Sequence, residues 1–187
     1  MKQLFKKIDE LISEKPNIII GIDGQCASGK TTLALKLAEE FDAQVIHMDD
    51  FFLPFDMRTQ TRLSETGGNV HYERFNAEVV SGLENRTGFV YRAFCCKSGT
   101  YAEEKEVLPD CPVIIEGAYA FHPKIKLMYD LKIFLKADYD TRLERILNRN
   151  GAEALEVFKN KWIPLEDKYF AEFGIEGKSD IVKQTEK

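Results

Sequence analysis

Residues 24–32 read GQCASGKTT, and this stretch decides the fold of the chain. The stretch fits the pattern G-x-x-x-x-G-K-[ST], whose fixed positions are taken by Gly24, Gly29, Lys30 and Thr31. A β-branched apolar run precedes it at 17–22, and apolar residues at helical spacing follow it at 33–41. Strand, loop and helix therefore stand in the order that the pattern requires, which a chance glycine-rich turn would not reproduce.

A loop of this kind binds anions. Its successive main-chain N–H groups and the positive end of the following helix form a cradle for phosphate groups. Lys30 is placed to reach the β- and γ-phosphates, and the Thr31 hydroxyl is placed to ligate Mg²⁺. The sequence therefore predicts a site for ATP and Mg²⁺. We expect nine loop residues to contact the nucleotide: Gly24, Gln25, Cys26, Ala27, Ser28, Gly29, Lys30, Thr31 and Thr32.

Composition excludes several other classes of protein. The 187 residues are 44% hydrophobic and 30% charged, as in globular chains, and suffice for one domain. A net charge of −5 argues against a nucleic-acid-binding surface. No apolar run approaches the roughly 20 residues of a membrane-spanning helix, and no export signal is visible. None of the four cysteines forms a C-x-x-C pair. We therefore expect reduced thiols and a cytoplasmic location.

Apolar runs alternate between strand-like and helix-like spacing along the chain. We expect strands at 17–22, 43–48, 112–116, 131–135 and 179–182. We expect helices at 4–12, 33–41, 73–83, 138–150 and 152–173, the last of them broken near Pro164. This alternation predicts an α/β fold of the P-loop NTPase type, with a parallel sheet of about five strands and helices on both faces.

Three segments stand apart from this alternation. Residues 53–70 lack periodicity, which is typical of a functional flap. Residues 88–94 and 106–108 indicate a hairpin-like excursion around Ser98 and Gly99. The apolar face of the helix at 4–12 fits packing at the domain edge and also fits a contact in a homo-oligomer.

Acidic residues follow two of the expected strands. Ligands of parallel sheets gather at the carboxyl ends of the strands, where Asp49, Asp50 and Glu116 stand. Mg²⁺ held by Thr31 needs one or two further carboxylates, and a hydroxyl that is phosphorylated needs a group to accept its proton. The simpler interpretations involve no metal or catalysis: Asp49 and Asp50 would form a helix cap or turn, and Glu116 would be a solvated strand end.

Three arginines share one face of the helix expected at 138–150. Arg142, Arg145 and Arg149 are spaced three and four residues apart. Such a stripe is either a solvated helix surface or a lid, at about 142–151, that closes on phosphates. We expect the lid, because arginine stabilises the charge of a phosphoryl group in transfer.

Aromatic residues and one cysteine carry weaker signals. Phe51 and Phe52 are candidates to stack on a planar substrate, although at least one fits a core position. Trp162 fits helix packing better than base stacking. Cys26 lies near a helix N-terminus, which favours a thiolate, so we expect its oxidation to hinder nucleotide binding.

Four motifs in order give the chain a family resemblance. They read GIDGQCASGKTT, HMDDFF, VIIEGAYAFH and DYDTRLERILNR, and the match extends from Ile18 to about Val182. With these motifs the chain resembles the uridine kinase family, which belongs with phosphoribulokinase and bacterial pantothenate kinase. The resemblance implies a single P-loop kinase domain over residues 1–187.

The resemblance also implies roles for individual residues. Asp49 matches the catalytic base that approaches the metal, and Glu116 matches the glutamate that completes the Mg²⁺ shell with Thr31. With Lys30, the lid arginines Arg142 and Arg145 are the expected catalytic cations, and Arg149 is expected to bind ATP. The expected substrate contacts are Asp49, Phe52, His71, Tyr91, Glu116, Arg142 and Arg145.

Two departures concern the phosphoryl acceptor. The family's ribose-binding aspartate reads Val70 here, a gap that Glu73 is placed to fill. The family's tyrosine–aspartate pair reads Tyr91-Arg92, and its base-reading histidine is replaced here within Phe94-Cys95-Cys96. We expect an ATP-dependent kinase for the 5′-hydroxyl of a uridine- or cytidine-like nucleoside.

Two alternatives stay open. One is a kinase for a non-nucleoside alcohol such as pantothenate or a sugar phosphate, which Arg58, Arg62 and Arg92 would favour if they line the pocket. The other is a nucleotide-binding regulatory protein without activity.

Overall fold

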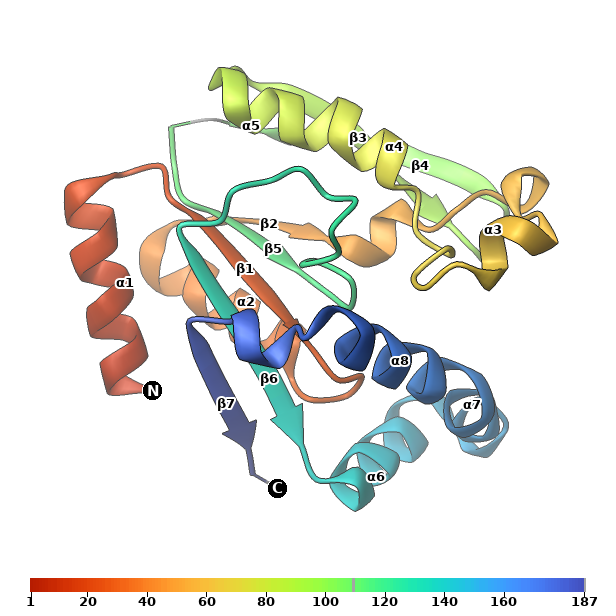
Figure 1. Ribbon diagram of the computed structural model, residues 1–187. Coiled ribbons are helices and arrows are strands. Elements are labelled where there is room, and N and C mark those ends of the chain that lie inside the picture. The colour runs from red at the N-terminus through yellow and green to blue at the C-terminus, as the bar shows by residue number, and fades with distance from the viewer. Residues whose placement is uncertain (109, 187) are drawn as a thin grey trace.

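The computed structural model describes residues 1–108 and 110–186. Its centre is a parallel five-stranded sheet with strand order β2-β5-β1-β6-β7 (Figure 1). The strands are β1 (Ile19–Gly24), β2 (Gln44–His47), β5 (Val113–Glu116), β6 (Leu131–Ala137) and β7 (Ile181–Thr185). The predicted parallel sheet of about five strands is therefore confirmed. Each predicted strand overlaps an observed one, with ends that differ by a few residues.

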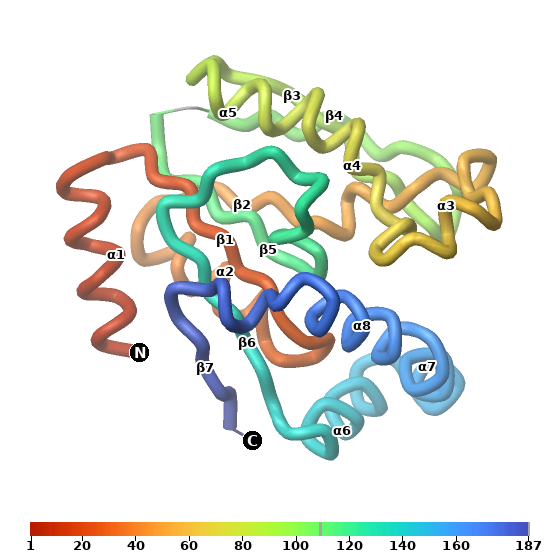
Figure 2. Tube along the Cα trace, viewed as in Figure 1, coloured from red at the N-terminus to blue at the C-terminus, as the bar shows by residue number. Residues whose placement is uncertain are grey.

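Helices cover both faces of this sheet, as predicted. The longer ones are α1 (Lys2–Glu14), α2 (Lys30–Phe41), α6 (Tyr139–Asn150) and α8 (Ile163–Phe173). The shorter ones are α3 (Gln60–Ser64), α4 (Tyr72–Phe75), α5 (Ser81–Asn85) and α7 (Ala152–Val157). In the Cα trace, α4 and α5 follow one another in a single rod alongside a hairpin of β3 (Phe89–Cys95) and β4 (Thr100–Val107). Helices α6, α7 and α8 lie together in the lower right of the same view (Figure 2). None of the helices among the described residues is both long and apolar enough to cross a membrane.

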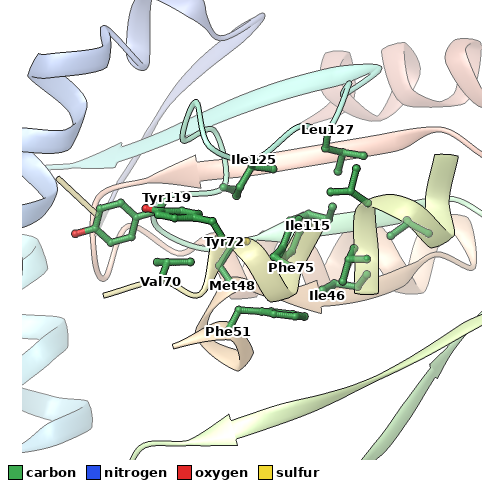
Figure 3. Close-up of a cluster of buried hydrophobic side chains, with 14 of the residues drawn as sticks. Ile46, Met48, Phe51, Val70, Tyr72, Phe75, Ile115, Tyr119, Ile125 and Leu127 are labelled. Carbon is green, nitrogen blue, oxygen red and sulfur yellow. The ribbon is translucent and has the colours of Figure 1, made fainter. Parts of the chain in front are cut away.

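Two apolar clusters explain why the helices pack where they do. On one face, α1 and α2 bury Ile8 and Leu37 against Ile20 and Ile133 of the sheet. On the other face, the helical rod from α4 to α5 and helix α8 pack against Ile46 and Ile115, together with Phe51 and Phe75 (Figure 3). The β-branched residues of the central strands point alternately to both clusters, as expected for a strand buried on both faces.

The segment at 53–70 contains more structure than its sequence pattern indicates. It includes a 3₁₀ turn at Phe55–Met57 and the helix α3, which is capped by Thr59: the Thr59 side chain accepts a hydrogen bond from the Arg62 amide. The excursion that follows is an antiparallel hairpin of β3 (Phe89–Cys95) and β4 (Thr100–Val107). The predicted hairpin is confirmed, and its second strand is longer than expected.

The break predicted near Pro164 is wrong. The chain stays helical from α7 through a π-helical turn at Phe158–Trp162 into α8. Pro164 occupies the first turn of α8, where a missing N–H is tolerated, and the wider π turn just before it absorbs the change in the hydrogen-bonding pattern. This continuous helix carries several residues of the cleft described next.

Candidate functional site

A cleft of about 950 Å³ opens at the carboxyl ends of β1, β2 and β5. This is the edge at which parallel sheets bind ligands, and the volume suits a nucleotide with a second small molecule. Its wall includes loop residues 26–32, the strand-end acids Asp49 and Glu116, residues of the 53–70 segment, and residues of the α7–α8 region.

The loop at the base of the cleft requires its glycines. Gly24 has a φ of 138°, and a Cβ placed there would lie 2.0 Å from the Leu135 carbonyl oxygen, so no larger residue fits without movement. Gly29 has a φ of 96° at the start of α2. The loop therefore approaches β6 closely and turns its amides into the helix N-terminus.

Lys30 is held by the loop itself. Its Nζ donates hydrogen bonds to the carbonyl oxygens of Gly24, at 2.8 Å, and Gln25, at 2.9 Å. Lys30 lines the cleft, so its ammonium group is positioned where an anion would enter, whereas Gly24 and Gln25 are not among the described residues of the cleft wall.

The loop and the strand ends also fit a nucleotide and a metal ion. The Ser28 hydroxyl is buried without a hydrogen-bond partner among the described residues, although it belongs to the cleft wall. Such an orphaned group calls for a ligand or water. The Thr31 hydroxyl donates to Glu116 Oε1 at 3.0 Å, which brings a hydroxyl and a carboxylate together as a Mg²⁺ site requires. In the described part of the chain no group of three His, Cys, Asp or Glu side chains forms a metal site. A Mg²⁺ ion here would thus depend on phosphate oxygens as well.

The two adjacent aspartates occupy different environments. Asp49 lines the cleft, where partial desolvation raises its pKa despite the opposing charge of Lys30. Asp50 turns instead to the hairpin: its Oδ2 accepts hydrogen bonds from Lys105 Nζ at 2.7 Å and from the Tyr91 hydroxyl at 3.1 Å. Of the two carboxylates, Asp49 is the one that faces the cleft.

Glu116 has a second partner at the end of β2. His47 Nδ1 lies 2.6 Å from Glu116 Oε1, and this contact is the main reason that the pKa of His47 is raised. Glu116 is only 5% exposed and is therefore held by Thr31 on one side and His47 on the other.

Two of the three arginines of α6, Arg142 and Arg145, form hydrogen bonds with the main chain of the loop. Arg142 donates from Nε to the Cys26 carbonyl oxygen at 3.1 Å, and Arg145 donates from Nη1 to the Ala27 carbonyl oxygen at 3.0 Å. Arg149 donates to its neighbour Asn150. Arg145 and Arg149 line the cleft, whereas Arg142 is buried behind the loop.

The residues expected to bind an acceptor divide into two groups. Phe52 lines the cleft, and its ring lies 6.4 Å from that of Trp162, so both rings form part of one wall. Tyr91 stacks on Phe51 beside Asp50, and His71 Nδ1 accepts the amide of Arg74 at the start of α4. The wall of the cleft, over the described residues, includes neither of them.

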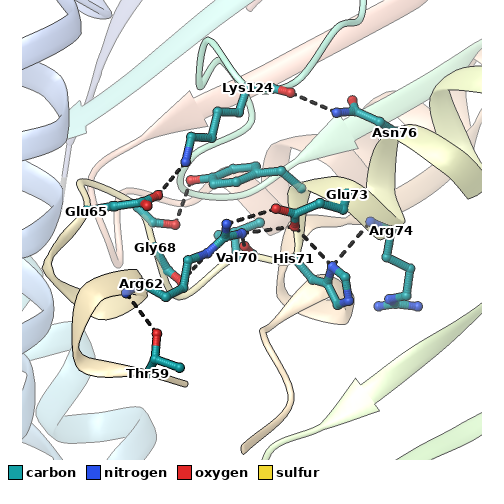
Figure 4. A network of polar contacts seen from close by, with 12 residues as sticks. Thr59, Arg62, Glu65, Gly68, Val70, His71, Glu73, Arg74, Asn76 and Lys124 are labelled. Carbon is teal, nitrogen blue, oxygen red and sulfur yellow. Dashed lines mark hydrogen bonds and ion pairs between the residues drawn. The ribbon is translucent and has the colours of Figure 1, made fainter. Parts of the chain in front are cut away.

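Glu73, expected to fill the gap left at position 70, is not among the described residues that line the cleft. Its carboxylate forms an ion pair with Arg62, with 2.8 Å between Nη1 and Oε1, and also contacts His71 (Figure 4). Arg58 lines the cleft, but Arg62 is engaged by Glu73 and Arg92 donates to carbonyl oxygens of β4. Of the three arginines that would favour an acidic acceptor, Arg58 therefore meets the condition.

The expectation of a thiolate at Cys26 is wrong. Burial and the nearby Glu166 carboxylate raise the pKa of the Cys26 thiol to about 11. The thiol is only 6% exposed, and although Arg142 Nη2 donates a hydrogen bond to its sulfur at 3.3 Å, burial and the Glu166 charge outweigh that contact. The pKa shift thus removes the reason to expect a reactive cysteine in the loop.

Several residues of the site escaped the sequence reasoning. Asp23 is fully buried beneath the loop and accepts hydrogen bonds from the Gly24 amide, the Phe121 amide and the Tyr169 hydroxyl. Burial raises its pKa to about 6. Glu166 of α8 contacts the loop amide of Cys26. A charged residue at the end of a strand was a usable signal for Asp23, but nothing in the helical pattern of α8 distinguishes Glu166 from its acidic neighbour Asp167.

Tyr119 is another such residue, and it yields a prediction. Its backbone has a φ of 72°, and its hydroxyl is buried in the cleft wall with no partner among the described residues. Because an unpaired buried hydroxyl costs about 1–3 kcal/mol, Tyr119→Phe should raise the free energy of unfolding by on the order of 1 kcal/mol. Denaturant unfolding measures this change.

Tyr129→Phe is the matched control for that change. The Tyr129 hydroxyl donates to the Ala120 carbonyl oxygen at 2.7 Å, so its removal should destabilise the protein. Equal destabilisation by both substitutions would contradict the prediction and would mean that the Tyr119 hydroxyl has a partner in solution.

Comparison with known proteins gives a family match and several relatives. A model of the phosphoribulokinase/uridine kinase family matches residues 19–154. Uridine-cytidine kinase B of Dictyostelium discoideum is 31% identical over 148 residues, which cover 74% of this chain and 60% of that protein. The uridine kinase of Clostridium botulinum (strain Okra / Type B1) is 28% identical over 154 residues, or 73% of this chain and 70% of the relative.

The fold also agrees with a solved structure. A possible uridine kinase from Bacillus stearothermophilus superimposes with a TM-score of 0.66 at 20% identity, covering 96% of this chain and 98% of that one. The P-loop NTPase fold is thereby confirmed. The chain spans less than two thirds of the length of the Dictyostelium relative. The family match covers most of the chain, and the chain therefore belongs to the phosphoribulokinase/uridine kinase family.

Proposed function

We propose that the protein is an ATP-dependent kinase that transfers the γ-phosphoryl group to a hydroxyl of a small molecule. One observation carries the proposal: Asp49, Glu116 and the Lys30 loop border a single cleft at the carboxyl ends of the strands. This is the arrangement that phosphoryl transfer needs, because the reaction depends on position and charge more than on covalent chemistry.

The donor side would be held by the loop. The amides of residues 29–32 and the Ser28 hydroxyl would bind phosphate oxygens, and Lys30 would turn from its loop carbonyls to the β- and γ-phosphates. Thr31, Glu116 and Asp49 would hold Mg²⁺, which when bound neutralises charge on the phosphate oxygens. The bond between Thr31 and Glu116 supports this role, since it places both ligands side by side.

On the acceptor side, Asp49 would orient the hydroxyl and accept its proton as the phosphoryl group arrives. Arg145 and Arg149 reach the cleft and would neutralise the phosphoryl oxygens, as a lid at 142–151 would do on closing. Arg142, which is buried behind the loop, would act with Arg145 by holding the loop carbonyls.

The acceptor that we propose is the 5′-hydroxyl of a nucleoside. The rings of Phe52 and Trp162 give the cleft an aromatic wall for a planar base, and curated relatives are named uridine and uridine-cytidine kinases. Arg58, also in the wall, favours a second candidate: an alcohol that carries a carboxylate or phosphate group.

The test is a product screen. The protein is incubated with Mg-ATP and a panel of nucleosides, hydroxy acids and sugar phosphates. Mass spectrometry then detects which compound has increased in mass by one phosphoryl group. A phosphorylated nucleoside is the expected result, and a phosphorylated anionic alcohol would favour the second candidate. A panel that yields no product would leave a nucleotide-binding regulatory protein.

A further inference from the structure

An acidic side chain of α8, Glu166, forms a hydrogen bond with the main chain of the phosphate-binding loop. Glu166 is 7% exposed, and its Oε2 accepts the Cys26 amide hydrogen with 2.7 Å between the nitrogen and oxygen. A carboxylate that accepts a main-chain N–H in a buried place forms one of the stronger classes of hydrogen bond. This bond joins a helix near the end of the chain to the third residue of the phosphate-binding motif.

Arg142 forms a second hydrogen bond with Cys26. Its Nη2 lies 4.0 Å from Glu166 Oε2, and its Nε donates to the Cys26 carbonyl oxygen. Cys26 is thus held by its N–H from α8 and by its C=O from α6. The opposite charges of Arg142 and Glu166 compensate each other, which a buried carboxylate requires.

The next residue explains why the loop needs such support. Ala27 has a φ of 57°, a left-handed conformation that costs a residue with a Cβ roughly 1–2 kcal/mol. Its carbonyl oxygen accepts a hydrogen bond from Arg145. Strained backbone of this kind persists only where its surroundings fix it.

We propose that Glu166 is a positioning residue for nucleotide binding: by holding the Cys26 amide, it keeps Cys26 and Ala27 in the conformation that turns the following loop amides toward the phosphates. The inference rests on the ATP-binding part of the proposed function and not on the identity of the acceptor. It makes α8 part of the nucleotide site, although no residue of α8 belongs to the motif.

Two substitutions of similar volume separate this role from simple packing. Glu166→Gln keeps an oxygen that accepts the Cys26 amide hydrogen, whereas Glu166→Met fills the same space without an acceptor. Glu166→Met should weaken the binding of Mg-ATP about tenfold or more, the loss expected for one buried charge-assisted hydrogen bond, and Glu166→Gln should recover most of it. Isothermal titration with Mg-ATP gives the affinities, and thermal unfolding shows that each variant is folded.

The neighbouring acid provides the control. Asp167 is exposed on the same helix, and Asp167→Asn should leave the affinity for Mg-ATP unchanged. Should Glu166→Met fail to fold, Glu166→Asp takes its place, because the shorter side chain withdraws the oxygen from the amide while keeping the charge.

The outcomes separate this inference from the proposed function. If folded Glu166→Met binds Mg-ATP as tightly as the wild type, or if the Gln and Met variants lose affinity equally, the positioning role is wrong and the kinase proposal stands. A wild-type protein that does not bind Mg-ATP would overturn both.

Discussion

Asp49→Asn is expected to lower kcat by about a hundred- to ten-thousandfold, the range that a general base contributes, while the affinity for Mg-ATP falls far less, because Thr31 and Glu116 still hold the metal ion. Asparagine has nearly the same shape as aspartate but does not accept a proton from the acceptor hydroxyl. Asp49 faces the cleft beside Lys30 and Glu116, so the substitution removes the base that we assign to the reaction. Steady-state kinetics with the acceptor from the product screen, together with titration of Mg-ATP, measure the two effects separately.

Asp50→Asn is the matched control. The Asp50 carboxylate is bound to Lys105 and Tyr91 of the hairpin, so its loss should lower the stability of that contact and reduce kcat far less. If Asp49→Asn turned over at the wild-type rate, or if Asp50→Asn were the more damaging change, the assignment of Asp49 as the base would be wrong.

Lys30→Met should abolish tight binding of Mg-ATP and lower turnover by on the order of a hundredfold or more. Lys30 is the cation at the base of the cleft, and its present partners are uncharged carbonyl oxygens of the loop. Methionine keeps the length of the side chain but removes the charge that would meet the β- and γ-phosphates. Equilibrium titration of the variant with Mg-ATP measures the loss.

Lys7→Met, an exposed lysine on α1, serves as the comparison and should bind Mg-ATP like the wild type. Wild-type affinity in Lys30→Met would mean that nucleotide does not bind at the loop.

Much of the fold was predictable because its determinants are local. The β-branched run before the loop and the run that ends at Glu116 are short, apolar and bounded by turns, so each indicates a buried strand. Pro164 misled because a proline usually ends a helix. Here Pro164 lies in the first turn of α8, directly after the π-helical turn at Phe158–Trp162. The π turn depends on packing between distant residues, which a local sequence pattern does not reveal.

The site was predictable only in part, for a similar reason. The rule that ligands gather at the carboxyl ends of strands led to Asp49 and Glu116, and the structure places both in the cleft wall. The rule does not distinguish Asp49 from Asp50, because the distinction comes from Lys105, far along the chain on the hairpin. Glu166 lies farther still from the loop that it contacts, and an acid on an amphipathic helix carries no signal of a buried partner.

The most direct test of whether the cleft transfers a phosphoryl group to an alcohol follows the radiolabelled γ-phosphate of ATP and measures which product contains the label. The protein is incubated with the labelled Mg-ATP and pooled small metabolites, and the labelled products are separated from ATP and inorganic phosphate. We predict that the label enters an organic phosphate in the presence of wild-type protein and does so at least a hundredfold more slowly with Asp49→Asn. Label that stays in ATP, or leaves it only as inorganic phosphate, would contradict the account.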